Sequence, residues 1–143
     1  MAIDRQFIGF RLPPFTVTVD AGKVRRFAAA IGVGVDAQSD GSPPPTYLKV
    51  IEGEGHSSRE ILAALGVDLT RVLHAEQEFE YHASFRGGDA LTVERVVSDI
   101  YERKGGQLEF IVVDSVIRHV GGALVGRTQQ VILVRHPAAV AAV

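Results

Sequence analysis

The chain contains no cysteine. It can therefore form neither a disulfide nor a thiolate-ligated zinc site. No apolar run approaches the roughly 20 residues that a membrane-spanning helix needs. The N-terminal stretch MAIDRQFIGFRL also lacks the basic start and the apolar core of a secretory signal. We therefore expect a soluble, cytoplasmic protein that does not associate with a membrane.

A strong charge of either sign is also absent, since the formal net charge is -2 at pH 7. This balance gives no reason to expect binding to nucleic acid or to an anionic membrane surface. With 143 residues, 46% of them hydrophobic, the chain has the size of one ordinary domain. We expect a single domain over residues 1–143, in which residues 137–143 form a loose tail.

The segment Pro43–Gly66, PPPTYLKVIEGEGHSSREILAALG, predicts the central helical element. Its prolines suit the approach to a helix and its first turn, where no backbone donor is lost. Gly53 and Gly55 weaken the helix soon after it begins. Ser57 and Glu60 then have the spacing of a capping box, so we expect a second short helix that begins at Ser57.

Most of the remaining chain predicts strands. The exception follows Asp20, a residue suited to a helix N-cap, and we expect a helix over residues 21–31. From Leu73 onward the apolar period becomes two, and glycine pairs separate the extended runs. This pattern predicts an antiparallel sheet of five strands, at Phe15–Val19, Leu73–Phe85, Leu91–Arg103, Leu108–His119 and Leu124–Arg135.

Alternation in the strand that begins at Leu73 places its acidic residues on one face. Glu76, Glu78 and Glu80 share this predicted face with His74 and His82. A metal site there is one reading, but a solvated or salt-bridged face fits better because no cluster has ligand spacing. In a later strand, Phe110–Val113 is apolar on both faces, which predicts a central strand covered on each side.

Five segments together resemble the MaoC-like dehydratase family with the hot-dog fold. They are RRFAAAIG (25–32), PPTYLKVIEGEG (44–55), LHAEQEFEYH (73–82), KGGQLEFIVVDS (104–115) and ALVGRTQQVILVR (123–135). The closest similarity is to the acyl-binding subunits of (3R)-hydroxyacyl-ACP dehydratases. The resemblance implies an α+β fold in which a five-stranded antiparallel sheet wraps around a central helix. It also implies pairing with a second hot-dog domain, with acyl thioesters bound between the two.

The loop VGVDAQSDGS, at residues 33–42, departs from the family pattern. Catalytic members carry an aspartate and then a histidine here, usually around an Asn-Pro pair, whereas this loop has no histidine and no Asn-Pro. Asp36 or Asp40 is a candidate for the acidic position, although both are also ordinary turn residues. His56, in the glycine-rich break GEGHSS, is the candidate proton carrier, and its alternative role is that of a solvated loop residue.

Hydration of an enoyl thioester needs a base, an acid and donors for the charge that grows on the thioester oxygen. Through the resemblance, the start of the central helix is the candidate substrate-binding site, formed by Pro45, Thr46 and Tyr47 together with Gly53. Free amides at a helix N-terminus could supply the donors. The alternative is an ordinary helix start. We expect neither a cofactor nor a metal.

We therefore interpret the chain as an (R)-specific enoyl thioester hydratase or 3-hydroxyacyl dehydratase that acts on acyl-CoA or acyl-ACP. Because the loop histidine is missing, it is also a candidate for the acyl-binding half of a heterodimer; a homodimer is the other assembly considered. Two alternatives stay open. One is a non-catalytic acyl-thioester-binding hot-dog protein. The other is an acyl-thioester hydrolase or a repurposed tailoring enzyme.

Overall fold

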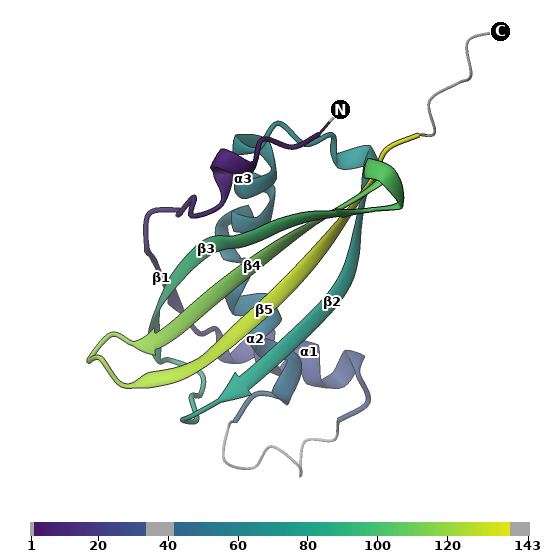
Figure 1. The fold of residues 1–143 in the computed structure, drawn as a ribbon. Helices are drawn as coiled ribbons and strands as arrows, with labels where there is room; N and C mark the ends of the chain where they lie inside the picture. Colours follow the sequence, from purple (N-terminus) through teal and green to yellow (C-terminus); the bar gives the residue numbers. More distant parts are fainter. Residues whose placement is uncertain (1, 34–41, 138–143) are drawn as a thin grey trace, which may run out of the picture.

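A computed structural model describes residues 2–33 and 42–137 of the chain. One antiparallel sheet has the strand order β1-β3-β4-β5-β2, which confirms the predicted five-stranded sheet (Figure 1). Its strands are β1 (Phe15–Thr18), β2 (Val72–Tyr81), β3 (Ala90–Arg103), β4 (Leu108–His119) and β5 (Leu124–Arg135). Three α-helices are described, namely α1 (Ala21–Ala30), α2 (Leu48–Glu52) and α3 (Ser57–Ala64).

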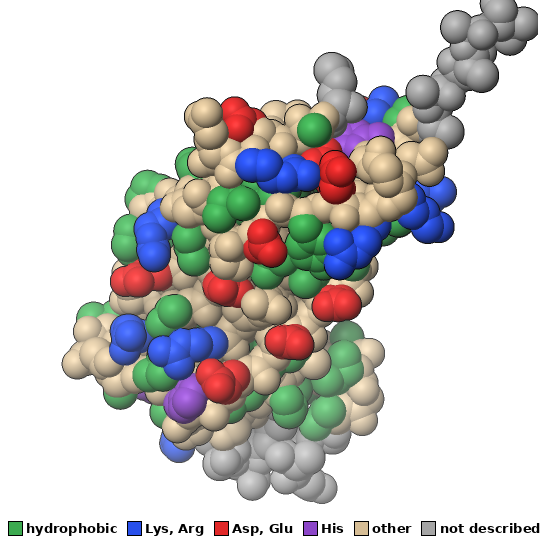
Figure 2. Space-filling view, viewed as in Figure 1, with side chains coloured by type: hydrophobic (Ala, Val, Ile, Leu, Met, Phe, Trp, Pro, Cys, Tyr) green, Lys and Arg blue, Asp and Glu red, His purple; other side chains and the backbone are tan. Residues whose placement is uncertain are grey.

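The helices lie behind one face of the curved sheet (Figure 1). In this part of the chain, no helix reaches the length and apolar character needed to cross a membrane. Asp20 caps α1 as predicted, because its side chain accepts hydrogen bonds from the amides of Gly22 and Lys23. The opposite face of the sheet carries acidic and basic side chains intermixed with apolar ones (Figure 2).

The central helical element breaks at its glycines, as the sequence predicts. α2 ends at Glu52, and Gly55 follows with a φ of 66°, which only glycine adopts freely. The predicted capping box is wrong: His56 is the N-cap of α3, and its side chain makes no capping hydrogen bond. Ser57 lies inside the helix, where its hydroxyl donates instead to the carbonyl of Glu52.

Two predictions about strand faces are corrected. The ladder between β2 and β5 shifts register between His74 and Glu76, and this bulge brings His74 opposite Ile132, a residue of the core. His74 is therefore not on the same face as the glutamates, and its Nε2 lies 3.0 Å from Oε1 of Gln77. On β4, Phe110 lies on the face without helices and stacks on Tyr101 at 4.9 Å, so this strand is covered by helices on one side only.

A buried polar network divides the core between helices and sheet into two apolar clusters. Its centre is Arg95 of β3, which is 1% exposed and whose Nη2 lies 3.5 Å from Oε2 of the fully buried Glu52. Arg95 also donates to the hydroxyls of Ser57 and Ser58, both at 2.8 Å, and to Oε1 of Gln130 at 2.7 Å. The network therefore ties both sides of the helix break to the middle of the sheet.

The carboxylate of Glu52 is engaged mainly through one oxygen. Thr128 donates to its Oε2 at 2.7 Å and Ser115 at 3.3 Å, whereas Oε1 has no hydrogen-bond partner among the described residues and lies 3.3 Å from the Lys49 ammonium. Arg95, Ser115 and Thr128 are direct cross-strand partners on β3, β4 and β5. A buried ion pair is tolerated when such hydrogen bonds replace the lost water.

Breaking this pair from one side should destabilise the fold strongly. We expect Arg95→Met to lower the free energy of unfolding by about 3–5 kcal/mol, because it leaves the Glu52 carboxylate buried without its partner. Urea unfolding measures the change. Arg25→Met, an equal truncation on the exposed face of α1, is the control and should change stability by less than about 0.5 kcal/mol. Equal losses in both variants would contradict a special role for Arg95.

Gly126 allows β2 to approach β5 next to the helix α2. A Cβ atom at this position would lie 2.3 Å from the carbonyl oxygen of Glu80 and 3.4 Å from Cδ1 of Leu48. Since backbone cannot yield as a flexible side chain does, we expect Gly126→Ala to destabilise by about 1–3 kcal/mol. Gly121→Ala is the matched control, because a Cβ there meets no atom within 4 Å. Melting temperatures measured by thermal unfolding test this expectation. Equal shifts for the two variants would contradict the close approach of β2 to β5.

Candidate functional site

A small cavity of about 200 Å³ lies at the start of the central helical element. Its walls come from two segments that are far apart in the sequence, the approach to the helix and the end of β2. The lining residues are Ser42, Pro43, Pro45, Tyr81, Ser84 and Phe85. The phenol of Tyr81 donates a hydrogen bond to the carbonyl of Pro45, which joins the two walls.

The polar groups of the cavity wall are neutral at physiological pH. Burial raises the pKa of Tyr81 to about 12, so its phenol stays protonated and acts as a donor. Its side chain is nevertheless accessible, since Tyr81 is 42% exposed. None of the described lining residues is a histidine or a carboxylate. The cavity is therefore suited to an apolar group with one polar contact. A general base for catalysis would have to come from residues outside this lining.

Of the predicted residues at the helix start, Pro45 lines this cavity, whereas Thr46 and Tyr47 are not among its lining residues. A 3₁₀ helix, Pro45–Tyr47, precedes α2, and no described side chain caps its amides. The amide of Tyr47 donates to the carbonyl of Pro44 at 2.9 Å, so it is already engaged. The ring of Tyr47 is buried and packs edge-on against Phe27 at 5.2 Å. Thr46 is exposed, which leaves its amide as the donor available to a ligand.

Asp36 and Asp40 lie outside the described residues, so their candidate roles stay predictions. The described chain resumes at Ser42, which itself lines the cavity.

His56 and Gly53 do not line this cavity. Gly53 is the C-cap of α2, at the far end of the helix from Pro45. His56 follows it with a left-handed backbone, φ 58°, and is exposed. The structure thus separates the candidate proton carrier from the helix start by the whole length of α2. Neither residue is brought together with Thr46.

Sequence reasoning missed Tyr81, Ser84 and Phe85 as wall residues. Tyr81 was assigned correctly to a strand, but its contact with Pro45 spans 36 positions. Local patterns carry no signal for such a contact.

The acidic face of β2 is partly neutralised by ion pairs. His82 lies 3.0 Å from Glu80, and Arg127 lies 3.7 Å from the same carboxylate. The hydrogen bond from His82 is the main reason that the pKa of Glu80 lies below its usual value. Among the described residues, no group of three or more histidine or acidic side chains could hold a metal ion.

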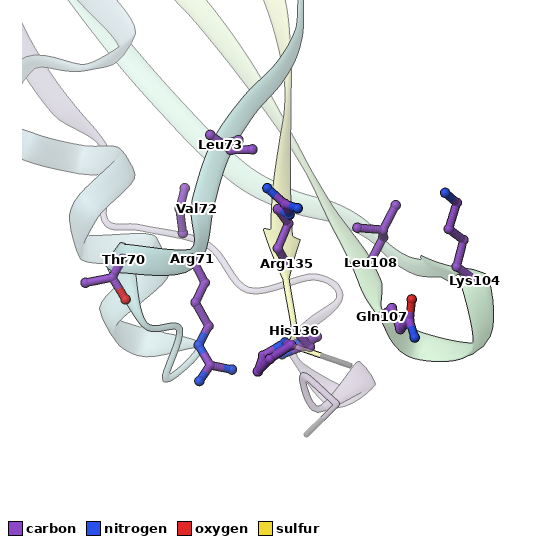
Figure 3. A pocket seen from close by; sticks show the side chains of 10 residues that line it. Thr70, Arg71, Val72, Leu73, Lys104, Gln107, Leu108, Arg135 and His136 are labelled. Carbon is purple, nitrogen blue, oxygen red and sulfur yellow. The ribbon is translucent and has the colours of Figure 1, made fainter. Parts of the chain in front are cut away.

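A second, larger cleft of about 660 Å³ lies at the opposite end of β2 (Figure 3). Its basic side chains come from three segments: Arg71 precedes β2, Lys104 lies in the turn between β3 and β4, and Arg135 ends β5. His136 also lines it, with Nε2 2.7 Å from the buried Glu109.

Comparison with known proteins assigns the family. A family model described as the FAS1-like dehydratase domain region matches residues 6–128. The chain belongs to this family of hot-dog dehydratases. A UPF0336 protein from Saccharopolyspora erythraea is 32% identical over 148 residues, which cover 94% of this chain and 93% of the relative.

Solved structures of low identity share the fold. The HadBC (3R-hydroxyacyl-ACP dehydratase) complex from Mycobacterium tuberculosis gives a TM-score of 0.72 at 18% identity, over 89% of this chain and 96% of the other. A hypothetical thioesterase from Streptococcus pneumoniae, solved with coenzyme A, gives 0.60 at 16% identity, over 96% and 88%. The resemblance to MaoC-like hot-dog dehydratases is thereby confirmed.

Proposed function

We propose that this protein binds enoyl or 3-hydroxyacyl thioesters, carried by CoA or acyl carrier protein, at the start of its central helix. In this proposal it is the acyl-binding member of an (R)-specific hydratase or dehydratase. The observation that carries the proposal is the cavity between Pro45 and Tyr81, whose described walls are formed by proline, aromatic and serine side chains.

The chemistry of the wall favours binding over self-sufficient catalysis. A phenol with a pKa of about 12 is a poor base near pH 7, and its single O–H is already donated to the carbonyl of Pro45. The amide of Thr46 is then the candidate donor for the developing oxyanion. The base must then come from the Asp36–Asp40 loop or from a partner domain.

The free edge of the sheet supports a partner. Within the described residues, β2 pairs only with β5, so its other side presents unpaired backbone groups, a liability that proteins normally cover. A second hot-dog domain added along β2 would pair with these backbone groups.

The catalytic part of the proposal is tested by a hydration assay on crotonyl-CoA. We expect the chain alone to bind this thioester but to hydrate it about 10²–10⁴-fold more slowly than a complete enzyme, because the loop lacks the histidine. A partner that carries an Asp-His loop should restore the rate. Fast turnover by the chain alone that His56→Ala leaves unchanged would refute the proposal, and release of free CoA would favour the hydrolase alternative.

Binding is measured in parallel by calorimetry. Ser84→Trp fills the cavity and should abolish crotonyl-CoA binding. Ser98→Trp places the same ring on an exposed position of β3 and is the control. If both variants bind like the wild type, the thioester site lies elsewhere.

The assembly has its own test. We expect light scattering to give the mass of a dimer for the isolated chain, since pairing along β2 removes the exposed edge. Glu78→Pro, in the middle of β2, should weaken this dimer because proline disrupts a strand ladder. A wild-type chain that stays monomeric at assay concentration would contradict the pairing.

A further inference from the structure

The edge of the sheet opposite β2 is formed by the short strand β1 (Figure 1). Among the described residues, β1 pairs only with β3. The amide of Val19, just after β1, donates to the carbonyl of Asp89 at 2.8 Å, and the same register places the odd-numbered residues of β1 with their backbone groups toward β3. Thr16 and Thr18 therefore present their amides and carbonyls to the outer side of the sheet.

A groove of about 660 Å³ lies along this outer edge. Thr16 and Thr18 line it on the strand side, and Gly55 and Glu60 line it on the side of the helix break. The two prolines that precede β1, at positions 13 and 14, also line it but have no amide to donate. A groove that offers unpaired strand backbone beside a second wall suits an extended peptide, which binds by adding a strand.

The groove carries a net negative charge. Its charged lining residues are Asp20, Lys23, Glu54 and Glu60. The one ammonium is already engaged, because Nζ of Lys23 lies 2.9 Å from Oε1 of Glu54. Among the described residues, Glu60 forms no ion pair. Three carboxylates against one paired ammonium favour a ligand that brings positive charge.

Apolar side chains of the groove are largely committed to the core. Leu12 and Val17 are buried, and Phe15 is half-buried against the apolar cluster beneath β1. Little apolar surface is left for the hydrophobic face of an amphipathic helix. An extended segment, by contrast, takes its affinity mainly from main-chain hydrogen bonds to a sheet edge. The composition of the groove therefore favours a strand over a helix.

We propose that the outer edge of β1 binds an extended, basic segment of a partner protein, which adds a sixth strand to the sheet. The backbone of Thr16 and Thr18 pairs with this segment. Alternate side chains of a strand point the same way, so a lysine or arginine at every second position faces Glu54 and Glu60. Because the site lies at the edge opposite β2, it is separate from the proposed thioester cavity and from pairing along β2.

A synthetic hexapeptide that alternates threonine and lysine is the probe, and calorimetry on the full chain measures its affinity. Replacing its lysines by glutamate should weaken binding by about tenfold or more, because the groove is acidic. Two further versions are N-methylated, one at the lysines and one at the threonines. Only one of these two sets of amides can face β1, so only one version should lose affinity. Equal affinities of the two versions would overturn pairing by the backbone.

Variants of the chain locate the site. Thr16→Pro removes the outward amide but keeps the ladder to β3, since an edge strand tolerates proline where its N–H faces solvent. It should weaken binding of the lysine peptide about tenfold, whereas Thr16→Val keeps the amide and should bind like the wild type. Glu60→Lys should weaken binding about 3–10-fold. Glu76→Lys, an equal charge change on an exposed residue of β2, is its control, and equal affinity in all four variants would overturn the site.

Hydrogen exchange on the wild type reads the pairing directly. In the free chain, β3 should protect the amides of Phe15 and Val17, while those of Thr16 and Thr18 exchange rapidly. Bound peptide should slow exchange at both threonines, and unchanged exchange there despite binding would overturn strand addition. Light scattering tests a second copy as the occupant. If Thr16→Pro, without peptide, separates an assembly that the wild type forms, the edge binds another copy of this chain and the proposal fails.

Discussion

The ion pair between Arg95 and Glu52 is the interaction on which the arrangement of this protein depends. α2 and α3 bury Leu48, Ile51 and Ile61, but the break between the two helices contains Gly53 and Gly55, which have no side chain to pack. Arg95 compensates by joining the last residue of α2 to the hydroxyls of Ser57 and Ser58 at the start of α3. With the break fixed in this way, the other end of α2 is fixed too, and that end carries the cavity wall.

Local patterns in the sequence predicted most of the helices and strands, but they did not predict the buried polar network around Arg95. The Asp20 cap, the glycine break and the boundaries of β4 and β5 all depend on residues close together in the chain. Arg95 shares the parity of the buried Val93 and Val97, yet no local pattern marks an arginine as buried. Burying it requires partners from four other elements, α2, α3, β4 and β5, and only the folded chain brings those together.

The corrections have the same physical origin. A Ser-x-x-Glu spacing normally makes a capping box, but the carbonyl of Glu52 competes successfully for the Ser57 hydroxyl because Glu52 is anchored from the sheet. The bulge beside His74 places this residue and the glutamates of β2 on different faces of the sheet. Strict alternation along the sequence cannot detect the one extra residue of a bulge. For the same reason, the contact of Tyr81 with Pro45 could be seen only once β2 was placed beside the helix start.

β2 connects these observations because it is the place where the single chain is incomplete. Its outer edge has unpaired backbone among the described residues, and its last residue, Tyr81, forms part of the wall of the apolar cavity. Antiparallel pairing of two such edges is an arrangement that would cover the unpaired backbone groups. The strand that needs protection and the strand that bounds the proposed thioester cavity are therefore the same.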